Sequence, residues 1–137
     1  MSRRSGWEAR LFALVADASE KPYTLGTHDC FSFACAVVEA LTGVDRWPEF
    51  VGYTTKRGAL EAIAKHGSNF EVAGDWFFGV PHSYDMRRYQ RGDIAALQTE
   101  DGEKHLGVVL GAHTAFLAPG GLLYVLTSTC LCLWAVG

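Results

Sequence analysis

Cys30 and His105 are the residues whose types and positions best suit nucleophilic chemistry. Cys30 follows Asp29, which can cap a helix, so its thiol lies in the first turn of a predicted helix. The free N–H groups and the positive dipole end found there favour a thiolate, and we therefore expect the pKa of the Cys30 thiol to be lowered. His105 opens a predicted strand directly after a charged turn, where it can serve as the base for that thiol. The alternative is that Cys30 is a small buried apolar residue and His105 a structural histidine.

The first half of the chain carries the helical signals that position Cys30. Apolar residues at helical spacing and suitable capping residues predict three helices, over residues 6–18, 29–43 and 54–67. The second of these has the clearest signals, with Asp29 as its N-cap and Gly43 just beyond its end. The third has Thr54 or Thr55 as its cap.

The second half of the chain has the pattern of strands and turns. Short runs rich in Val, Leu and Thr predict strands over residues 91–99, 104–113, 114–121, 122–129 and 131–136. Residues 68–91 are predicted to be irregular and rich in aromatic side chains, either a loop that faces a substrate or a cover over the core. Helices followed by an antiparallel sheet indicate an α+β fold with the helices packed on one face of a small sheet.

Length and composition restrict the class of protein. The 137 residues suit one domain, residues 1–137, and a hydrophobic fraction of 49% is enough to fill its core. The formal net charge is −3 and no basic stripe occurs, which argues against nucleic acid as the principal partner.

No membrane span or export signal is predicted. Residues 106–137 carry no charged side chain, but Pro119 and Gly120 interrupt them, which favours buried strands over a membrane helix. Near the N-terminus, Glu8, Arg10 and Asp17 interrupt the apolar run that a signal peptide needs. We therefore expect synthesis in the bacterial cytoplasm without an export signal.

The four cysteines are read as thiols, and no metal or other cofactor is expected. Cys30 and Cys35 lie five positions apart on one helix and do not share a face, which argues against a common metal site. Cys130 and Cys132 are predicted to share one face of a strand and to pack in the core. A metal module with thiol ligands is the alternative.

Four short stretches of this sequence resemble the NlpC-type cell-wall cysteine peptidases of the bacterial papain-like clan, in particular the small members encoded with phage tail genes. The matching stretches stand in the family's order: residues 23–26 before the pair 29–30, residues 41–43 at a helix end, residues 91–93 before a strand, and HLGVVLG from residue 105. The resemblance covers residues 22–43 and 91–119 well and the rest loosely.

The resemblance implies a papain-like domain, with N-terminal helices on a small antiparallel sheet or half-barrel, and a site made of three residues. Cys30 would be the nucleophile and His105 the general base, while the hydroxyl of Tyr23 would help the Cys30 N–H hold the oxyanion. Tyr23 could equally be a loop aromatic that covers the helix end. The family's third catalytic side chain, which orients the histidine, has no counterpart, because Leu117 and Ala118 occupy its region.

Other polar residues near these stretches are expected to have structural roles. Asp93 falls far from His105 in the predicted hairpin, and His113 lies at the far end of that hairpin. His28 is read as a loop residue and His66 as the end of the third helix.

The resemblance also implies a substrate and a location. The expected substrate is an amide bond in peptidoglycan stem peptides, and the expected location is the tail of a virion or phage-like particle, beside other tail-tip or hub proteins. The alternative is a structural tail-tip or adaptor protein that kept the fold and lost the activity, which the missing third side chain favours.

Overall fold

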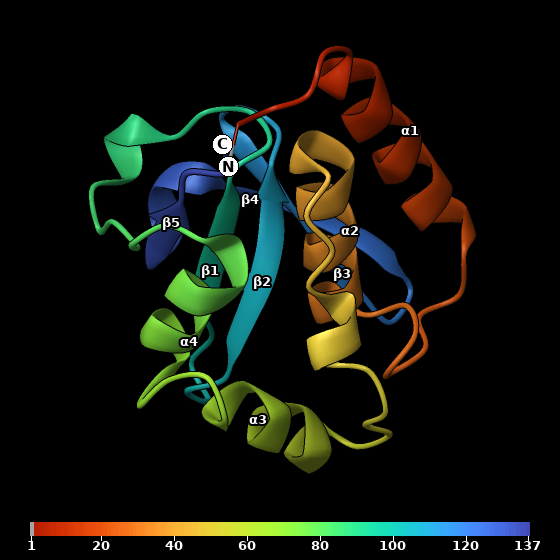
Figure 1. Cartoon of the computed structure of the whole chain (residues 1–137), viewed down its shortest axis with the longest axis vertical. Coiled ribbons are helices and arrows are strands. Elements are labelled where there is room, and N and C mark those ends of the chain that lie inside the picture. The colour runs from red at the N-terminus through yellow and green to blue at the C-terminus, as the bar shows by residue number, and fades with distance from the viewer. Residues whose placement is uncertain (1) are drawn as a thin grey trace.

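The computed structural model describes residues 2–137 and has helices in its first half and a sheet in its second (Figure 1). The helices are α1 (Trp7–Glu20), α2 (Cys30–Thr42), α3 (Lys56–Ala64) and α4 (Phe70–Phe78). The strands are β1 (Ile94–Gln98), β2 (Lys104–Val109), β3 (His113–Ala118), β4 (Gly121–Leu126) and β5 (Cys132–Trp134). The predicted α+β class is therefore confirmed.

The five strands form one antiparallel sheet in the order β4-β3-β2-β1-β5. In the β1–β2 hairpin, Leu97 stands opposite His105. Strand β2 pairs with β3 at Val108 and Val109, whereas β3 pairs with β4 over all six of its residues. Strand β3 therefore stays with β4 and separates from β2 toward the end of β2 that carries His105.

The two faces of the sheet carry two different apolar clusters. The helices cover one face, where α2 packs against β2 and β3 and buries Val37, Val38 and Leu41 together with Leu106 and Val108. The other face carries a smaller cluster of Ala95, Val109, Phe116 and Cys130. Because side chains alternate along a strand, His105 starts from this second face, like its partner Leu97.

The prediction of irregular structure over residues 68–91 is wrong, because α4 occupies part of this segment. Asn69 caps α4 by accepting a hydrogen bond from the Val72 N–H at 2.9 Å, and Gly79 ends the helix at φ 70°. Gly74 lies inside the helix because a Cβ there would overlap the ring of Trp134. A short helix with an internal glycine gives little helical signal, and tertiary packing against β5 explains both features.

Of the two predicted caps of the third helix, Thr55 is the one that caps α3, because its side chain accepts a hydrogen bond from the Gly58 N–H at 3.0 Å. Cys130 and Cys132 are both buried, but they do not share a face: Cys130 precedes β5 and joins the second cluster, while Cys132 joins the main core. The expectation of a common strand face is therefore wrong, because β5 begins only at Cys132.

Asp93 has the structural role expected for it. Its buried carboxylate accepts hydrogen bonds from Arg3 at 3.1 Å, from the Gln90 N–H at 2.8 Å and from the Val136 N–H at 3.2 Å. Burial raises the pKa of Asp93 although these donors oppose the change. The carboxylate thereby holds both ends of the chain against β1, and Figure 1 shows the two termini side by side.

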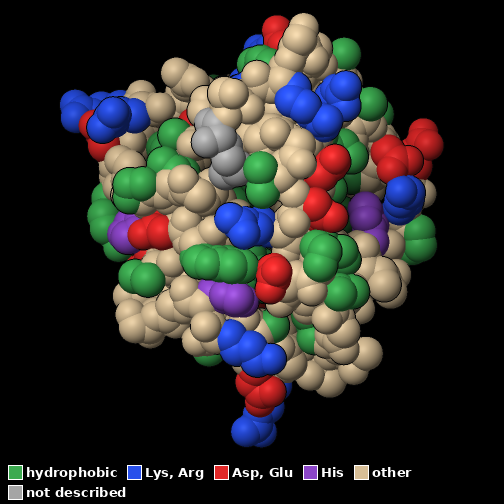
Figure 2. Space-filling model, viewed as in Figure 1, with side chains coloured by type: hydrophobic (Ala, Val, Ile, Leu, Met, Phe, Trp, Pro, Cys, Tyr) green, Lys and Arg blue, Asp and Glu red, His purple; other side chains and the backbone are tan. Residues whose placement is uncertain are grey.

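The surface carries charges of both signs. Figure 2 shows Lys and Arg side chains interspersed with Asp and Glu over one face, in line with the small formal net charge of −3. Among the described residues, no helix combines the length and the apolar character needed to cross a membrane.

Candidate active site

The start of α2 is fixed by a capping box that places Cys30 as the first helical residue. The Asp29 carboxylate accepts from the Ser32 N–H at 2.9 Å, and the Ser32 hydroxyl accepts from the Asp29 N–H at 2.8 Å. The N–H groups of Cys30 and Phe31 belong to the first turn, whose amides a helix cannot pair internally. They are therefore available to an anion placed beside the Cys30 thiol.

The second carboxylate oxygen of Asp29 holds the loop that leads into α2. It accepts a hydrogen bond from the Gly26 N–H at 2.8 Å and a short one from the Tyr53 hydroxyl. Gly26 adopts φ 92°, and a Cβ at this position would overlap the Tyr53 carbonyl oxygen. Tyr53, which no sequence signal connects to the site, thus fixes both the loop and the helix cap.

The surroundings of the partly exposed Cys30 side chain favour its neutral thiol over the thiolate. Burial raises its pKa to about 11, and the charge of Asp29 acts in the same direction. The backbone amides of Leu106, Cys30 and Phe31 lower the pKa but do not outweigh burial. The expectation of a lowered pKa is therefore wrong for the free protein, because enclosure by protein atoms outweighs the helix end.

The amide of Leu106 reaches the thiol because of how β2 is paired. Glu103 accepts from Thr99, and Val109 donates to Asp93, so the odd-numbered residues at both ends of the strand bond toward β1. The intervening Leu106 amide is therefore directed toward β3. In the described chain the β2–β3 pairing extends over Val108 and Val109, so Cys30 lies where the two strands have separated.

One pocket brings the three predicted site residues together. Its volume is about 450 Å³, and Tyr23, Cys30 and His105 all contribute to its lining. The remaining lining consists of apolar side chains, the buried Asp29 and a charged rim. The apolar residues are Leu25, Phe31, Ala59, Leu60 and Phe70, and the rim is Lys56, Asp101, Glu103 and Lys104, with Gly102 at the turn.

His105 lies in the pocket wall with its side chain 38% exposed. Its Nε2 lies 3.7 Å from Oε2 of Glu103, so its ion-pair contact is with a carboxylate and not with the thiol. Sequence reasoning did not find Glu103, although a carboxylate two positions before a strand histidine shares its strand face.

Tyr23 lines the pocket, and Leu117 and Ala118 occupy the region in which the third catalytic side chain is expected. Tyr23 is partly buried, and burial, followed by the charges of Cys30 and Asp29, raises the pKa of its hydroxyl. Leu117 is buried in the core and Ala118 ends β3. Both side chains are aliphatic, so neither offers a hydrogen-bond acceptor to His105.

The other histidines lie outside this pocket. His28 places its Nε2 3.3 Å from the Ala18 carbonyl oxygen, and His113 is exposed at the β2–β3 turn. His66 stacks on Trp76 with ring centroids 3.9 Å apart. Over residues 2–137, no group of three or more His, Cys, Asp and Glu side chains is placed to hold a metal ion.

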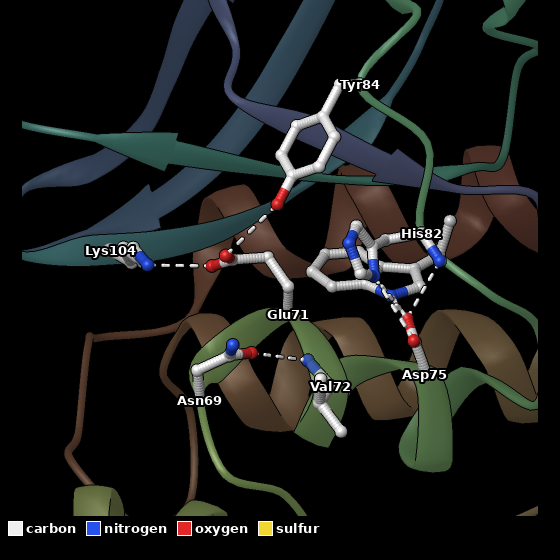
Figure 3. Close-up of polar contacts among 8 residues, drawn as sticks. Asn69, Glu71, Val72, Asp75, His82, Tyr84 and Lys104 are labelled. Carbon is white, nitrogen blue, oxygen red and sulfur yellow. Dashed lines mark hydrogen bonds and ion pairs between the residues drawn. The ribbon is translucent and has the colours of Figure 1, made fainter.

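A second polar cluster on α4 supports one wall of the pocket (Figure 3). Glu71 accepts a hydrogen bond from Lys104 at 2.7 Å and one from the Tyr84 hydroxyl at 3.3 Å. One turn further along α4, Asp75 accepts from His82 Nδ1 at 2.9 Å and from the Trp134 indole at 2.9 Å. The Glu71 hydrogen bonds hold Lys104 beside the pocket, and the hydrogen bond from Trp134 to Asp75 attaches α4 to β5.

The fold and the site together define an α+β protein in which a capped helix presents a cysteine to a pocket shared with a histidine and a tyrosine. A family model described as a domain of unknown function (DUF6950) matches residues 2–136, so the chain belongs to that family. A comparison of this chain with curated proteins found no match.

Asp29→Ala is expected to lower the free energy of unfolding by about 1.5–5 kcal/mol. It removes a helix cap, worth about 0.5–2 kcal/mol, and leaves the buried donors of Gly26 and Tyr53 without an acceptor, at about 1–3 kcal/mol. Denaturant unfolding measures the loss. Asn69→Ala, which removes the exposed cap of α4, is the matched control and should cost about 1 kcal/mol. Equal losses in the two variants would show that Asp29 acts as a cap alone.

Alkylation of Cys30 by iodoacetamide is expected to accelerate about tenfold per pH unit from pH 7 toward pH 10, because the thiolate fraction rises until the pKa of about 11. Mass spectrometry of the labelled peptides under native conditions measures the rate. Cys35, which is buried and whose pKa is raised to about 12, is the internal control and should label only after unfolding. A rate for Cys30 that is already constant below pH 8 would contradict the structure.

Proposed function

We propose that this protein is a papain-like cysteine hydrolase of the NlpC type that cleaves an amide bond in peptidoglycan stem peptides. The observation that carries the proposal is that Cys30, at the capped start of α2, lines the same pocket as His105 and Tyr23. A nucleophile, a base and a hydroxyl beside free helix amides are the groups that acyl transfer requires.

In the proposed reaction, His105 accepts the proton of the Cys30 thiol as the sulfur attacks the substrate carbonyl. The carbonyl π electrons move to oxygen, and the amides of the first turn of α2 and the Tyr23 hydroxyl stabilise the resulting oxyanion. The C–N bond then breaks and the departing amine takes the proton from His105, which leaves a thioester. Water attacks the thioester carbonyl and gives a proton to His105. The C–S bond then breaks, His105 returns that proton to the sulfur, and the carboxylic acid and the thiol of Cys30 are released.

The raised thiol pKa determines when the proton moves. Since the thiol is neutral in the free protein, the proton leaves in step with attack on a bound substrate, and no preformed thiolate is required. A neutral resting thiol also resists oxidation, because the thiolate is the reactive form.

The pocket has the shape and charge for a short branched peptide. Apolar side chains such as Phe31 and Phe70 offer contact area, and the rim presents both signs of charge. The exposed Lys56 suits a substrate carboxylate, whereas the exposed Asp101 suits a substrate amine. Stem peptides carry both kinds of group.

The proposed location is the tail of a phage or phage-like particle, with tail-tip or hub proteins as partners. The edge strand β4 exposes Tyr124 and Leu126 on one face and Leu123 on the other, so this edge of the sheet presents apolar side chains to such a protein. Attachment to a particle would hold the site at high local concentration near the cell wall.

The second candidate is a structural tail-tip or adaptor protein of the same fold without activity. Two observations favour it: Leu117 and Ala118 stand in place of the third catalytic side chain, and the thiol pKa is raised. The intact set of Cys30, His105 and Tyr23 in one pocket favours the hydrolase.

Cys30→Ala is expected to lower hydrolysis of purified stem peptides by at least about 10³-fold, since the variant has no nucleophile. Its free energy of unfolding should change by less than about 2 kcal/mol, because little packing is lost. Product formation is followed by chromatography and mass spectrometry. Cys130→Ala, which alters a thiol on the other face of the sheet, is the control and should retain activity. Turnover by the Cys30→Ala variant at the rate of the unaltered protein would exclude this nucleophile.

The chain is expected to be present in purified intact tails, at a constant ratio to the other tail proteins. Quantitative mass spectrometry of the particles measures this ratio. A variant with Leu123, Tyr124 and Leu126 changed to serine should be lost from the particles and keep its hydrolytic activity. Absence of the unaltered chain from intact tails, with activity free in the medium or periplasm, would exclude the proposed location.

A further inference from the structure

We propose that Glu103 is the positioning residue for His105 and replaces the third catalytic side chain that β3 lacks. This inference rests on the proposed function, because it assigns the group that orients the base of the same site. It comes from the contact between Oε2 of Glu103 and Nε2 of His105 at 3.7 Å.

The local backbone brings these two side chains together. Glu103 immediately precedes β2 and His105 is its second residue, so both side chains start from the same face of the strand. The Glu103 carbonyl accepts from the Thr99 N–H at 2.9 Å, which fixes the end of the hairpin. The 3.7 Å separation is an ion-pair distance and longer than a hydrogen bond, as expected of catalytic contacts that tighten when substrate binds.

The other carboxylates of the pocket are committed elsewhere. Asp29 accepts from the Gly26 and Ser32 amides and from the Tyr53 hydroxyl. Asp101 accepts from the Thr99 hydroxyl and, at 3.0 Å, from the Glu103 amide. Among residues 2–137, the Glu103 carboxylate accepts side-chain hydrogen bonds from Lys56, with Nζ at 3.1 and 3.3 Å from its two oxygens.

The ion pair between Lys56 and Glu103 is too weak to prevent Glu103 from contacting His105. Lys56 is 74% exposed and Glu103 43% exposed, and ion pairs with such exposure contribute little because water competes for both partners. Lys56 belongs to α3, on another wall of the pocket.

An acceptor at Nε2 determines which ring nitrogen can act as the base. A carboxylate beside Nε2 keeps the proton of neutral imidazole on that nitrogen, which leaves the lone pair of Nδ1 for the thiol proton. The same carboxylate stabilises the imidazolium that forms when the thiol is deprotonated. Glu103 would thus act through His105 without touching the substrate's reacting atoms.

The test uses the full chain labelled with ¹⁵N-histidine, in which the tautomer of neutral His105 is read from long-range ¹H–¹⁵N correlation spectra. The His105 signals are assigned by their absence from a His105→Gln variant. The unaltered chain is expected to hold the proton mainly on Nε2, and Glu103→Ala to give a mixture of tautomers. Glu103→Gln, whose amide oxygen can still accept from Nε2, should restore the tautomer.

Kinetics on stem peptides supply the second measurement. Glu103→Ala is expected to lower kcat at least tenfold with little change in KM. The kcat of Glu103→Gln should lie between those of the unaltered chain and Glu103→Ala, because the Gln amide orients the ring without stabilising the imidazolium. Lys56→Met is the matched control for loss of the ion pair, and it should leave the tautomer of His105 unchanged.

Two results would overturn the inference: an unchanged tautomer in Glu103→Ala, or a changed tautomer with kcat unaffected. In both cases the loss of hydrolysis in Cys30→Ala would still support the hydrolase. If the unaltered chain hydrolyses no stem peptide, the proposed function fails and the catalytic role of Glu103 fails with it. The tautomer spectra then report separately whether the Glu103–His105 contact exists.

Discussion

The buried carboxylate of Asp29 is the group on which the geometry of the site depends. Its two oxygens accept from the Ser32 amide inside α2, from the Gly26 amide in the preceding loop and from the Tyr53 hydroxyl beyond the helix. A buried carboxylate is costly unless its oxygens are bonded, so these three donors must come together for the chain to fold. Their convergence fixes the first turn of α2 and therefore the position of Cys30.

A second constraint is the separation of β3 from β2, which makes room for this helix end. The Leu106 amide, directed toward β3 by the pairing of β2 with β1, lies beside the Cys30 thiol instead of a strand partner. A fully paired β2–β3 ladder would use that amide and close the space. Irregular pairing is thus the feature that brings helix and strand residues into one pocket.

Local signals in the sequence were enough to predict much of the fold, and non-local packing explains the rest. Asp29 and Gly43 bounded α2 correctly, because caps act over a few residues. Helix α4 was missed, since Gly74 is explained only by Trp134 sixty residues away along the chain. In the site, Cys30, His105 and Tyr23 could be named from short motifs, but the contribution of Tyr53 could not, because a loop brings it to Asp29.

The free energy that a helix end supplies is smaller than the cost of burying the Cys30 thiolate, which explains why the neutral thiol is favoured in the free protein. A helix end stabilises a neighbouring negative charge by about 0.3–1 kcal/mol at the surface and by up to about 2 kcal/mol when partly buried, which is less than the ~2.7 kcal/mol that two pKa units represent. Burial moves the pKa of Cys30 from 9.0 to about 11, so the dipole is too weak to reverse it. Under the proposed function, deprotonation of Cys30 therefore depends on groups that act when substrate is bound, namely His105 and the carboxylate proposed to orient it. In the proposed reaction, the Glu103–His105 contact therefore matters as well as the start of α2.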